Sequence, residues 1–187
     1  MDIVKDYIIE NRLDIFALTE TWLDDTCTYE SEEVTPSGDT FLQVDRTNKR
    51  GGGVGIICRE EYKPRLLKTQ HFTTFEHYVV ELKHSTALKL VVIYRPPSSS
   101  FPCFIQELTK LFEDMCLGNQ NTVIAGDLNI HFEIDLDTSN RQYKDLLHAF
   151  GLEQHVTQAT HCRGHTLDHI ISPSSENLTV SNVHLGA

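Results

Sequence analysis

The sequence NTVIAGDLN, residues 121–129, is the stretch that most strongly indicates the fold of this protein. Its short apolar run is typical of a covered β-strand, and side chains two positions apart on an extended chain share one face. Asp127 and Asn129 are therefore predicted to point to one place where the strand ends, and Gly126 would let the backbone come close to a ligand there. A carboxylate and an amide together can hold a water molecule and a phosphate oxygen. The alternative is an ordinary strand-to-loop turn, in which Gly, Asp and Asn are common for conformational reasons.

A second apolar segment, IFAL at residues 15–18, also runs out into polar residues. It is short and compatible with a covered strand, and Glu20 stands two residues beyond it. Because ligands of open α/β sheets bind beyond the carboxyl ends of the strands, Glu20 is a candidate oxygen ligand for a hard cation. Taken alone, this glutamate would more simply be a solvated loop residue.

A third strand-like segment, LKLVVIY at residues 88–94, stops at two prolines that cannot donate the hydrogen bonds of a β-ladder. Tyr94 has a hydroxyl that can reach a phosphate. The alternative is a core aromatic residue with its hydroxyl at the rim. Arg95 either contacts a phosphate as well or is an ordinary cation at the end of a strand.

These motifs follow one another along the chain as TETWL at residues 19–23, YRPP at 94–97, GDLN at 126–129 and TLDHII at 166–171. In their residues and their order, these motifs resemble the endonuclease/exonuclease/phosphatase family, and within it the apurinic-type endonuclease domain of non-LTR (LINE-like) retrotransposons. The resemblance covers nearly the whole chain. It implies an α/β fold, the DNase I-like four-layer sandwich in which two packed mixed β-sheets are flanked by helices.

The resemblance also implies a role for each residue at these positions. Glu20 is similar to the family's principal Mg²⁺ ligand, and Asp127 and Asn129 would complete the metal site, with Mn²⁺ as an alternative ion. Asp127 would also orient or deprotonate the attacking water, and Asn129 would hold the phosphate. Tyr94 would lie beside the scissile phosphate, and Asp168 would orient a catalytic histidine. Together these roles imply a Mg²⁺-dependent phosphodiester hydrolase derived from a retrotransposon DNA endonuclease.

The chain departs from the family pattern near both ends. Family members begin with a strand that carries an Asn or Asp of the metal site, whereas residues 1–10 have apolar side chains at helical spacing. The family's essential Ser-Asp-His does not occur in this sequence, and His169 and His184 lie within strand-like patterns. We therefore expect residues 1–187 to form a single domain that lacks its first strand and its C-terminal Ser-Asp-His segment, with impaired catalysis. The alternative is an inactive relic that acts as a protein- or nucleic-acid-binding module.

Composition is consistent with one soluble, monomeric domain that does not contact membranes. A length of 187 residues and a hydrophobic content of 40% suit a single core, and no apolar run approaches the ~20 residues that span a bilayer. The five cysteines are an odd set without a Cys-x-x-Cys pair, which favours reduced thiols and an intracellular location, nuclear or cytoplasmic. The net charge of −11 predicts weak binding to DNA by the domain alone. The basic residues 46–50 either contact the DNA backbone or form a flexible hairpin turn.

The predicted elements mix strands and helices. Strands are expected at residues 15–19, 41–44, 53–58, 78–82, 89–94, 121–125, 166–171 and 180–184. Helices are expected at residues 3–10, 102–116 and 141–150. The hairpin-like runs between residues 41 and 94 favour two sheets packed face to face over a strictly parallel sheet.

A competing site is formed by residues that are close together in sequence, namely His161, Cys162, His165 and His169. On a helix, the spacing of these histidines would produce a stripe of zinc ligands. However, Gly164 interrupts the segment, and residues 166–171 alternate as a strand does, which would place Asp168 and His169 on opposite faces. The pattern therefore weighs against a zinc site on a helix.

Overall fold

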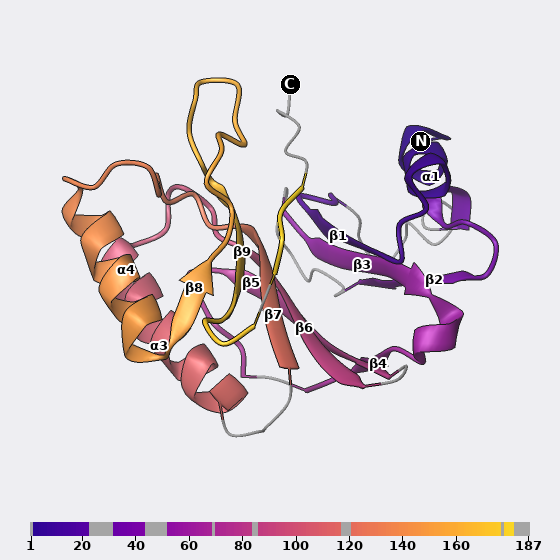
Figure 1. The fold of residues 1–187 in the computed structure, drawn as a ribbon, viewed down its shortest axis with the longest axis horizontal. Coiled ribbons are helices and arrows are strands. Elements are labelled where there is room, and N and C mark those ends of the chain that lie inside the picture. Colours follow the sequence, from indigo (N-terminus) through magenta and orange to yellow (C-terminus); the bar gives the residue numbers. More distant parts are fainter. Residues whose placement is uncertain are drawn as a thin grey trace.

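The computed structural model describes residues 2–22, 32–43, 52–68, 70–83, 86–116, 121–176 and 178–181. The strands are β1 (Ile15–Thr19), β2 (Asp39–Gln43), β3 (Val54–Arg59), β4 (Arg65–Leu66), β5 (Glu76–Lys83), β6 (Ala87–Tyr94), β7 (Asn121–Asp127), β8 (Leu152–Gln154) and β9 (Asp168–Pro173). The helices with described bounds are α1 (Asp2–Asn11), α3 (Phe101–Cys116) and α4 (Thr138–Ala149), with a 3-10 turn at Glu60–Tyr62, and residues 32–34 are also helical. The strands form a 3-stranded sheet of order β1-β3-β2 and a 6-stranded sheet of order β4-β5-β6-β7-β9-β8 (Figure 1).

The 6-stranded sheet is mixed, and helices α3 and α4 cover one of its faces (Figure 1). β6 and β7 run parallel because α3 carries the chain back between them, whereas the other neighbouring strands are antiparallel. The apolar stripe of α3, which includes Phe104 and Leu108, packs against Ile93 and Ile124 of these two strands. The parallel pairing brings the carboxyl ends of β6 and β7 to the same edge of the sheet.

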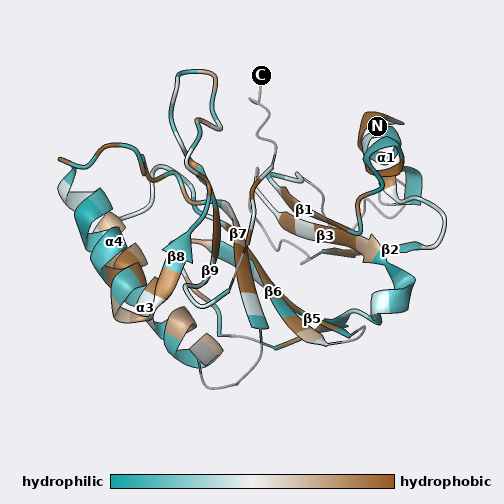
Figure 2. Ribbon diagram, in the orientation of Figure 1, coloured by the Kyte–Doolittle hydropathy of each residue, from teal (hydrophilic) through white to brown (hydrophobic). Residues whose placement is uncertain are grey.

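The opposite face of this sheet packs on the 3-stranded sheet. Ile56 of β3 forms a second core cluster with Tyr78, Val92 and Tyr94 of the larger sheet. Because successive side chains on a strand point to opposite faces, Ile93 faces α3 while its neighbours face β3. Figure 2 shows hydrophobic residues along the strands of both sheets, where these two clusters lie.

Helix α1 provides the outer layer on the side of the smaller sheet. Phe16, Ile57 and Phe41 are in register across its three strands, on the face turned away from the larger sheet. The ring of Tyr7 in α1 lies 6.1 Å from that of Phe16, measured between centroids. The expected DNase I-like sandwich of two packed sheets flanked by helices is therefore confirmed. The described strands of the smaller sheet are all antiparallel, so that only the larger sheet is mixed.

Most predicted elements occur close to their expected positions, and the differences have local causes. Helix α4 begins at Thr138 rather than at residue 141, because the Asp137 side chain caps it by accepting a hydrogen bond from the Ser139 N–H. The strand expected from residue 166 begins at Asp168. The N–H of the preceding residue, Leu167, donates to the Thr160 hydroxyl at 3.0 Å. The short strands β4 and β8 were not predicted.

Two sequence expectations fall largely on residues that the structure does not describe. Of the strand expected at 180–184, residues 180 and 181 are described and are not in a strand, and the others lie outside the described residues. The basic residues 46–50 also lie outside them. Within the described part of the chain, no helix has both the length and the apolar character needed to cross a membrane.

Candidate active site

Three neighbouring strands of the larger sheet bring polar side chains to one level. Tyr94 on β6 is in register with Asp127 on β7, and Asp127 is in register with Asp168 on β9. Residues directly opposite one another on neighbouring strands project from the same face. Since Tyr94 belongs to the core cluster between the two sheets, all three side chains lie on the side of the smaller sheet, where the strands β6 and β7 end.

Glu20 reaches this place from the smaller sheet. The Tyr94 hydroxyl donates a hydrogen bond to Oε1 of Glu20 at 2.5 Å. The turn after β1 is held by a bond from the Trp22 N–H to the Gly52 carbonyl at 2.9 Å. Glu20 and Trp22 have φ angles of 54° and 56°, a region that side-chain-bearing residues seldom occupy. Such strained backbone is concentrated at functional sites, where the surrounding structure maintains it.

Glu76 joins the two sheets beside the site, a role that nothing in its sequence context indicated. Its Oε2 accepts a hydrogen bond from the Gly53 N–H at 2.7 Å. Glu76 on β5 is also in register with Tyr94 on β6. This carboxylate therefore fixes the glycine turn that supports the Glu20 segment.

Asp127 and Asn129 are joined by two hydrogen bonds. Oδ1 of Asp127 accepts from the Asn129 backbone N–H at 2.9 Å, and Oδ2 accepts from Asn129 Nδ2 at 3.1 Å. The same Nδ2 donates to the Arg95 carbonyl at 2.9 Å. Because both partners of Nδ2 can only accept, the orientation of the amide is fixed. Oδ1 of Asn129 is consequently the atom of this side chain that is suited to a metal or to a bound water.

Arg95 is buried and supports the loop after β7. Both predictions for this residue, a phosphate contact and an ordinary cation at the end of a strand, are therefore wrong. Its side chain is only 5% exposed. Nη1 donates to the backbone carbonyls of Leu128 and Asn129 at 3.1 and 3.2 Å, and Nη2 donates to that of Ser99 at 3.1 Å. Burial lowers the pKa of Arg95, while the charge of Asp127 raises it. Arg95 is thus a positioning residue for the Gly-Asp-Leu-Asn segment.

Gly126 is required by the packing of two strands of the larger sheet, a reason that the sequence did not indicate. Its φ angle is 143°, and a Cβ at this position would lie 1.9 Å from the carbonyl oxygen of Ile93 on the neighbouring strand. The close backbone approach is therefore between β6 and β7. It keeps Asp127 level with Tyr94.

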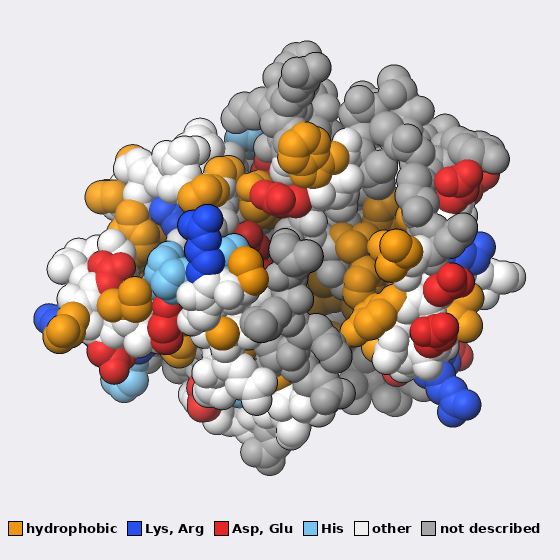
Figure 3. Space-filling view, turned by 90° about the horizontal axis from the view of Figure 1, so that it is seen from above, with side chains coloured by type: hydrophobic (Ala, Val, Ile, Leu, Met, Phe, Trp, Pro, Cys, Tyr) orange, Lys and Arg blue, Asp and Glu red, His pale blue; other side chains and the backbone are white. Residues whose placement is uncertain are grey.

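The electrostatics of the site are dominated by carboxylates. Burial has the largest effect on Asp127 and raises its pKa; the Asn129 hydrogen bonds lower it, and the charges of Asp168 and Glu20 raise it again, to about 6. The view from above shows Asp and Glu side chains together with Lys and Arg side chains on this face of the molecule (Figure 3). A divalent cation would offset this mutual repulsion. The oxygen donors of Glu20, Asp127 and Asn129 fit a hard ion such as Mg²⁺ or Mn²⁺.

Among the described residues, no histidine forms a hydrogen bond or an ion pair with the Asp168 side chain. The adjacent His169 is 1% exposed and projects to the other face of the sheet, where its Nδ1 lies 2.8 Å from the Tyr143 hydroxyl. Burial lowers the pKa of His169 to about 4. The expected opposite orientation of Asp168 and His169 is confirmed, and this segment forms β9 rather than a helix with a histidine stripe. His184 lies outside the described residues.

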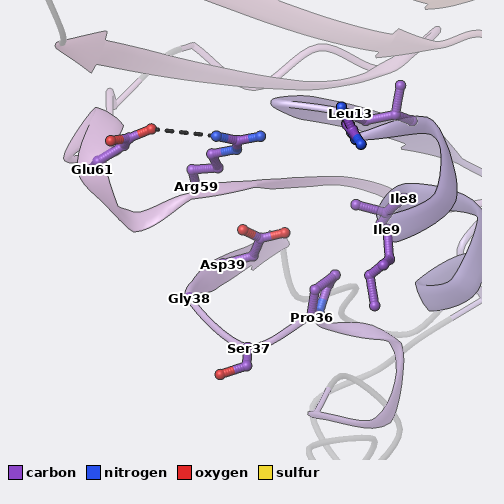
Figure 4. Close-up of a pocket in the computed structure, with 10 residues that line it drawn as sticks. Ile8, Ile9, Leu13, Pro36, Ser37, Gly38, Asp39, Arg59 and Glu61 are labelled. Atoms are coloured by element: carbon purple, nitrogen blue, oxygen red, sulfur yellow. Dashed lines mark ion pairs between the residues drawn. The ribbon is translucent and has the colours of Figure 1, made fainter.

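A separate pocket lies between α1 and β2 (Figure 4). Apolar side chains from α1 line it together with Asp39, Arg59 and Glu61. Arg59 is paired with Asp14 at 3.1 Å and with Glu61 at 3.7 Å. None of the candidate site residues lines this pocket.

The motifs and the geometry agree with a comparison of the whole sequence, which matches the sequence model of the endonuclease/exonuclease/phosphatase family over residues 1–186. The chain belongs to this family. A search of curated proteins found no match.

Several solved structures share the fold of this family member. The endonuclease domain of TRAS1, a telomere-specific non-LTR retrotransposon, has a TM-score of 0.69 and 13% identity, over 92% of this chain and 77% of that chain. An AP endonuclease from Leishmania major has a TM-score of 0.65 and 14% identity, over 91% and 73% of the two chains. ANGEL2, a 2',3'-cyclic phosphatase, has a TM-score of 0.63 and 14% identity, over 93% and 74%. At these identities the similarity establishes the fold.

Proposed function

We propose that this protein is a phosphodiester hydrolase that uses Mg²⁺ and acts on DNA. The observation that carries the proposal is the meeting of Glu20, Asp127 and Asp168 beside the Tyr94 hydroxyl, where the neighbouring carboxylates help to raise the pKa of Asp127. Membership of the family supports the hydrolysis of phosphate esters. The likeness to a retrotransposon endonuclease domain supports a nucleic acid as the substrate.

The cation would be held by side-chain oxygens of Glu20, Asp127 and Asn129. When bound, a divalent cation supplies positive charge that offsets the negative charge developing on the phosphate oxygens. Nδ2 of Asn129 is already committed to Asp127 and to the Arg95 carbonyl. This leaves Oδ1 to face the cation or a water molecule.

The chain's own residues would then position and deprotonate the attacking water. Asp127 would act as the general base, because its carboxylate lies at the end of β7 and burial raises its pKa above that of an ordinary aspartate before a cation binds. The Tyr94 hydroxyl holds Glu20 in place through its hydrogen bond. Its single proton could be donated to a phosphate oxygen only in place of Glu20. Asp168, exposed at the same level, would orient a group that contacts the phosphate.

We also propose that turnover by this chain is slow. No histidine among the described residues forms a hydrogen bond or an ion pair with Asp168, and loss of one donor that stabilises the transition state costs about 10²–10³ in rate. The net charge of −11 weakens the approach of a polyanionic substrate as well.

The test is the nicking of supercoiled plasmid DNA in the presence of Mg²⁺, with Mg²⁺ binding measured separately by calorimetry. Asp127→Asn should reduce nicking at least ~100-fold. Asp145→Asn, the same change at an exposed position on α4, should leave it unchanged. Equal nicking by wild type and Asp127→Asn would contradict the proposal. Mg²⁺ binding without any nicking would favour an inactive binding module instead.

A further inference from the structure

A second group of metal-binding side chains lies in the loops that flank the candidate active site. His131 and Glu133 belong to the loop after β7, and His165 belongs to the loop before β9. One ligand atom from each of these residues lies within 4.8 Å of the others. Nδ1 of His165 and Nδ1 of His131 are 2.8 and 3.8 Å from the same atom, Oε1 of Glu133.

The two loops are joined by contacts that leave these atoms facing one another. The Phe132 N–H donates to the Thr166 carbonyl at 3.3 Å, and the Thr166 N–H donates to Oε2 of Glu133 at 3.0 Å. The Phe132 ring packs inward against His169, with centroids 5.5 Å apart and planes at 72°. Because Phe132 is anchored inward, the residues on either side of it, His131 and Glu133, are held in the more exposed part of the loop.

From this arrangement we propose that His131, Glu133 and His165 bind a transition-metal cation of the zinc class. Two imidazoles and a carboxylate are a ligand set that zinc accepts with water in the remaining position, whereas Mg²⁺ prefers oxygen ligands. The side chains are 41%, 32% and 32% exposed, which leaves room for that water. The second oxygen of Glu133 is held by Thr166, and such an outer contact orients a ligating carboxylate.

The side chains need only a small adjustment to reach coordination distances. Ligand atoms around a tetrahedral zinc with bonds of about 2 Å lie roughly 3.3 Å apart, compared with the 4.8 Å limit observed for this group. The rings of His131 and His165 have centroids 4.0 Å apart. Rotation of partly exposed side chains can provide a shift of this size.

This site differs from the helical zinc stripe that the sequence spacing suggested. His169 is buried against Tyr143, and the partners of His165 come instead from a segment more than thirty residues earlier in the chain. His131 lies two residues after Asn129, and His165 lies three residues before Asp168. A cation at this site would therefore cross-link the two loops that carry those candidate active-site residues.

The experiment uses the full chain with the substitution Glu20→Gln, which removes an oxygen ligand from the other site. Zn²⁺ binding is measured by calorimetry, and Co²⁺ binding by visible absorption, which reports nitrogen ligation in a low-coordinate site. We expect one equivalent of either ion to bind, with a rise in melting temperature. His131→Ala and His165→Asn should each weaken binding at least ~100-fold, since even outer-contact changes cost about 10–100-fold.

The matched control is His148→Ala, which removes an exposed histidine from the last turn of α4 and should leave the affinity unchanged. His165→Asn keeps an N–H donor for Glu133 but is a poor zinc ligand, so that its fold and its melting temperature without metal should be maintained. The proposal is overturned if neither ion binds. It is also overturned if both cluster variants keep the parent's Zn²⁺ affinity, or if binding is lost only when Asp127→Asn is added.

Discussion

Replacing Gly126 with alanine tests whether the register of β6 and β7 builds the candidate active site. The added Cβ would lie 1.9 Å from the carbonyl oxygen of Ile93, 2.8 Å from its carbonyl carbon and 2.9 Å from its nitrogen. All three are backbone atoms of the neighbouring strand, so no side-chain rotation can relieve the overlap. The φ angle of 143° adds backbone strain of its own.

The expected cost combines these two effects. A backbone conformation that is nearly restricted to glycine costs about 1–3 kcal/mol when another residue must adopt it. Separating two central strands adds to this and brings the total to about 4 kcal/mol or more, the range of the most severe single substitutions. In a protein of this size, 1 kcal/mol shifts the melting temperature by roughly 2–4 °C. Gly126→Ala should therefore lower the melting temperature by at least ~8 °C.

Thermal and urea denaturation measure this loss, with Gly151→Ala as the control. Gly151 also has a positive φ angle, 63°, but a Cβ there would meet nothing within 4 Å. The Gly151→Ala variant should lose only about 1–2 kcal/mol of stability, which is the cost of a left-handed conformation for alanine. Equal losses for the two variants would refute the close-approach argument. Under conditions where Gly126→Ala remains folded, its Mg²⁺ affinity should also fall, because Asp127 would shift relative to Tyr94.

Three further predictions concern single side chains. Tyr94→Phe removes the donor to Glu20 and should weaken Mg²⁺ binding about tenfold, a loss near 1.4 kcal/mol that calorimetry can measure. An unchanged affinity would show that this hydroxyl does not organise the site. In Arg95→Lys, the lysine cannot reproduce the hydrogen bonds to the loop carbonyls. The free energy of unfolding, measured by urea denaturation, should fall by about 2 kcal/mol. A decrease below ~0.5 kcal/mol would contradict the supporting role of Arg95. Burial alone would raise the pKa of Glu107, but hydrogen bonds from Thr74 and the preceding threonine lower it from 4.5 to about 2. This carboxylate therefore stabilises the fold above pH 4.5 and loses its contribution as the pH falls towards 2. Glu107→Gln should make the acid loss of stability less steep in that interval, and parallel pH profiles for the two proteins would argue against the effect.

Local sequence determined the family, most of the strands and the main candidate residues. The segments at β1 and β7 are recognisable because each is short, apolar and followed by polar residues, although the structure leaves β1 only partly buried. Glu20 follows the first of these segments and Asp127 ends the second, and both positions, like the two-residue spacing of Asp127 and Asn129, are properties of a few consecutive residues. The alternation of an extended chain was also sufficient to predict that Asp168 and His169 face opposite ways.

Only the tertiary structure decided what these residues contact. Tyr94 meets Glu20 because two different sheets pack face to face. Gly126 is needed because β6 lies close beside it, and the Arg95 guanidinium is used inside the fold because the loop after β7 folds over it. The group of His131, Glu133 and His165 depends on hydrogen bonds between loops that are distant in sequence. Periodicity specifies the face of a strand on which a side chain lies, but partners across strands and loops follow from register and packing, which no local pattern encodes.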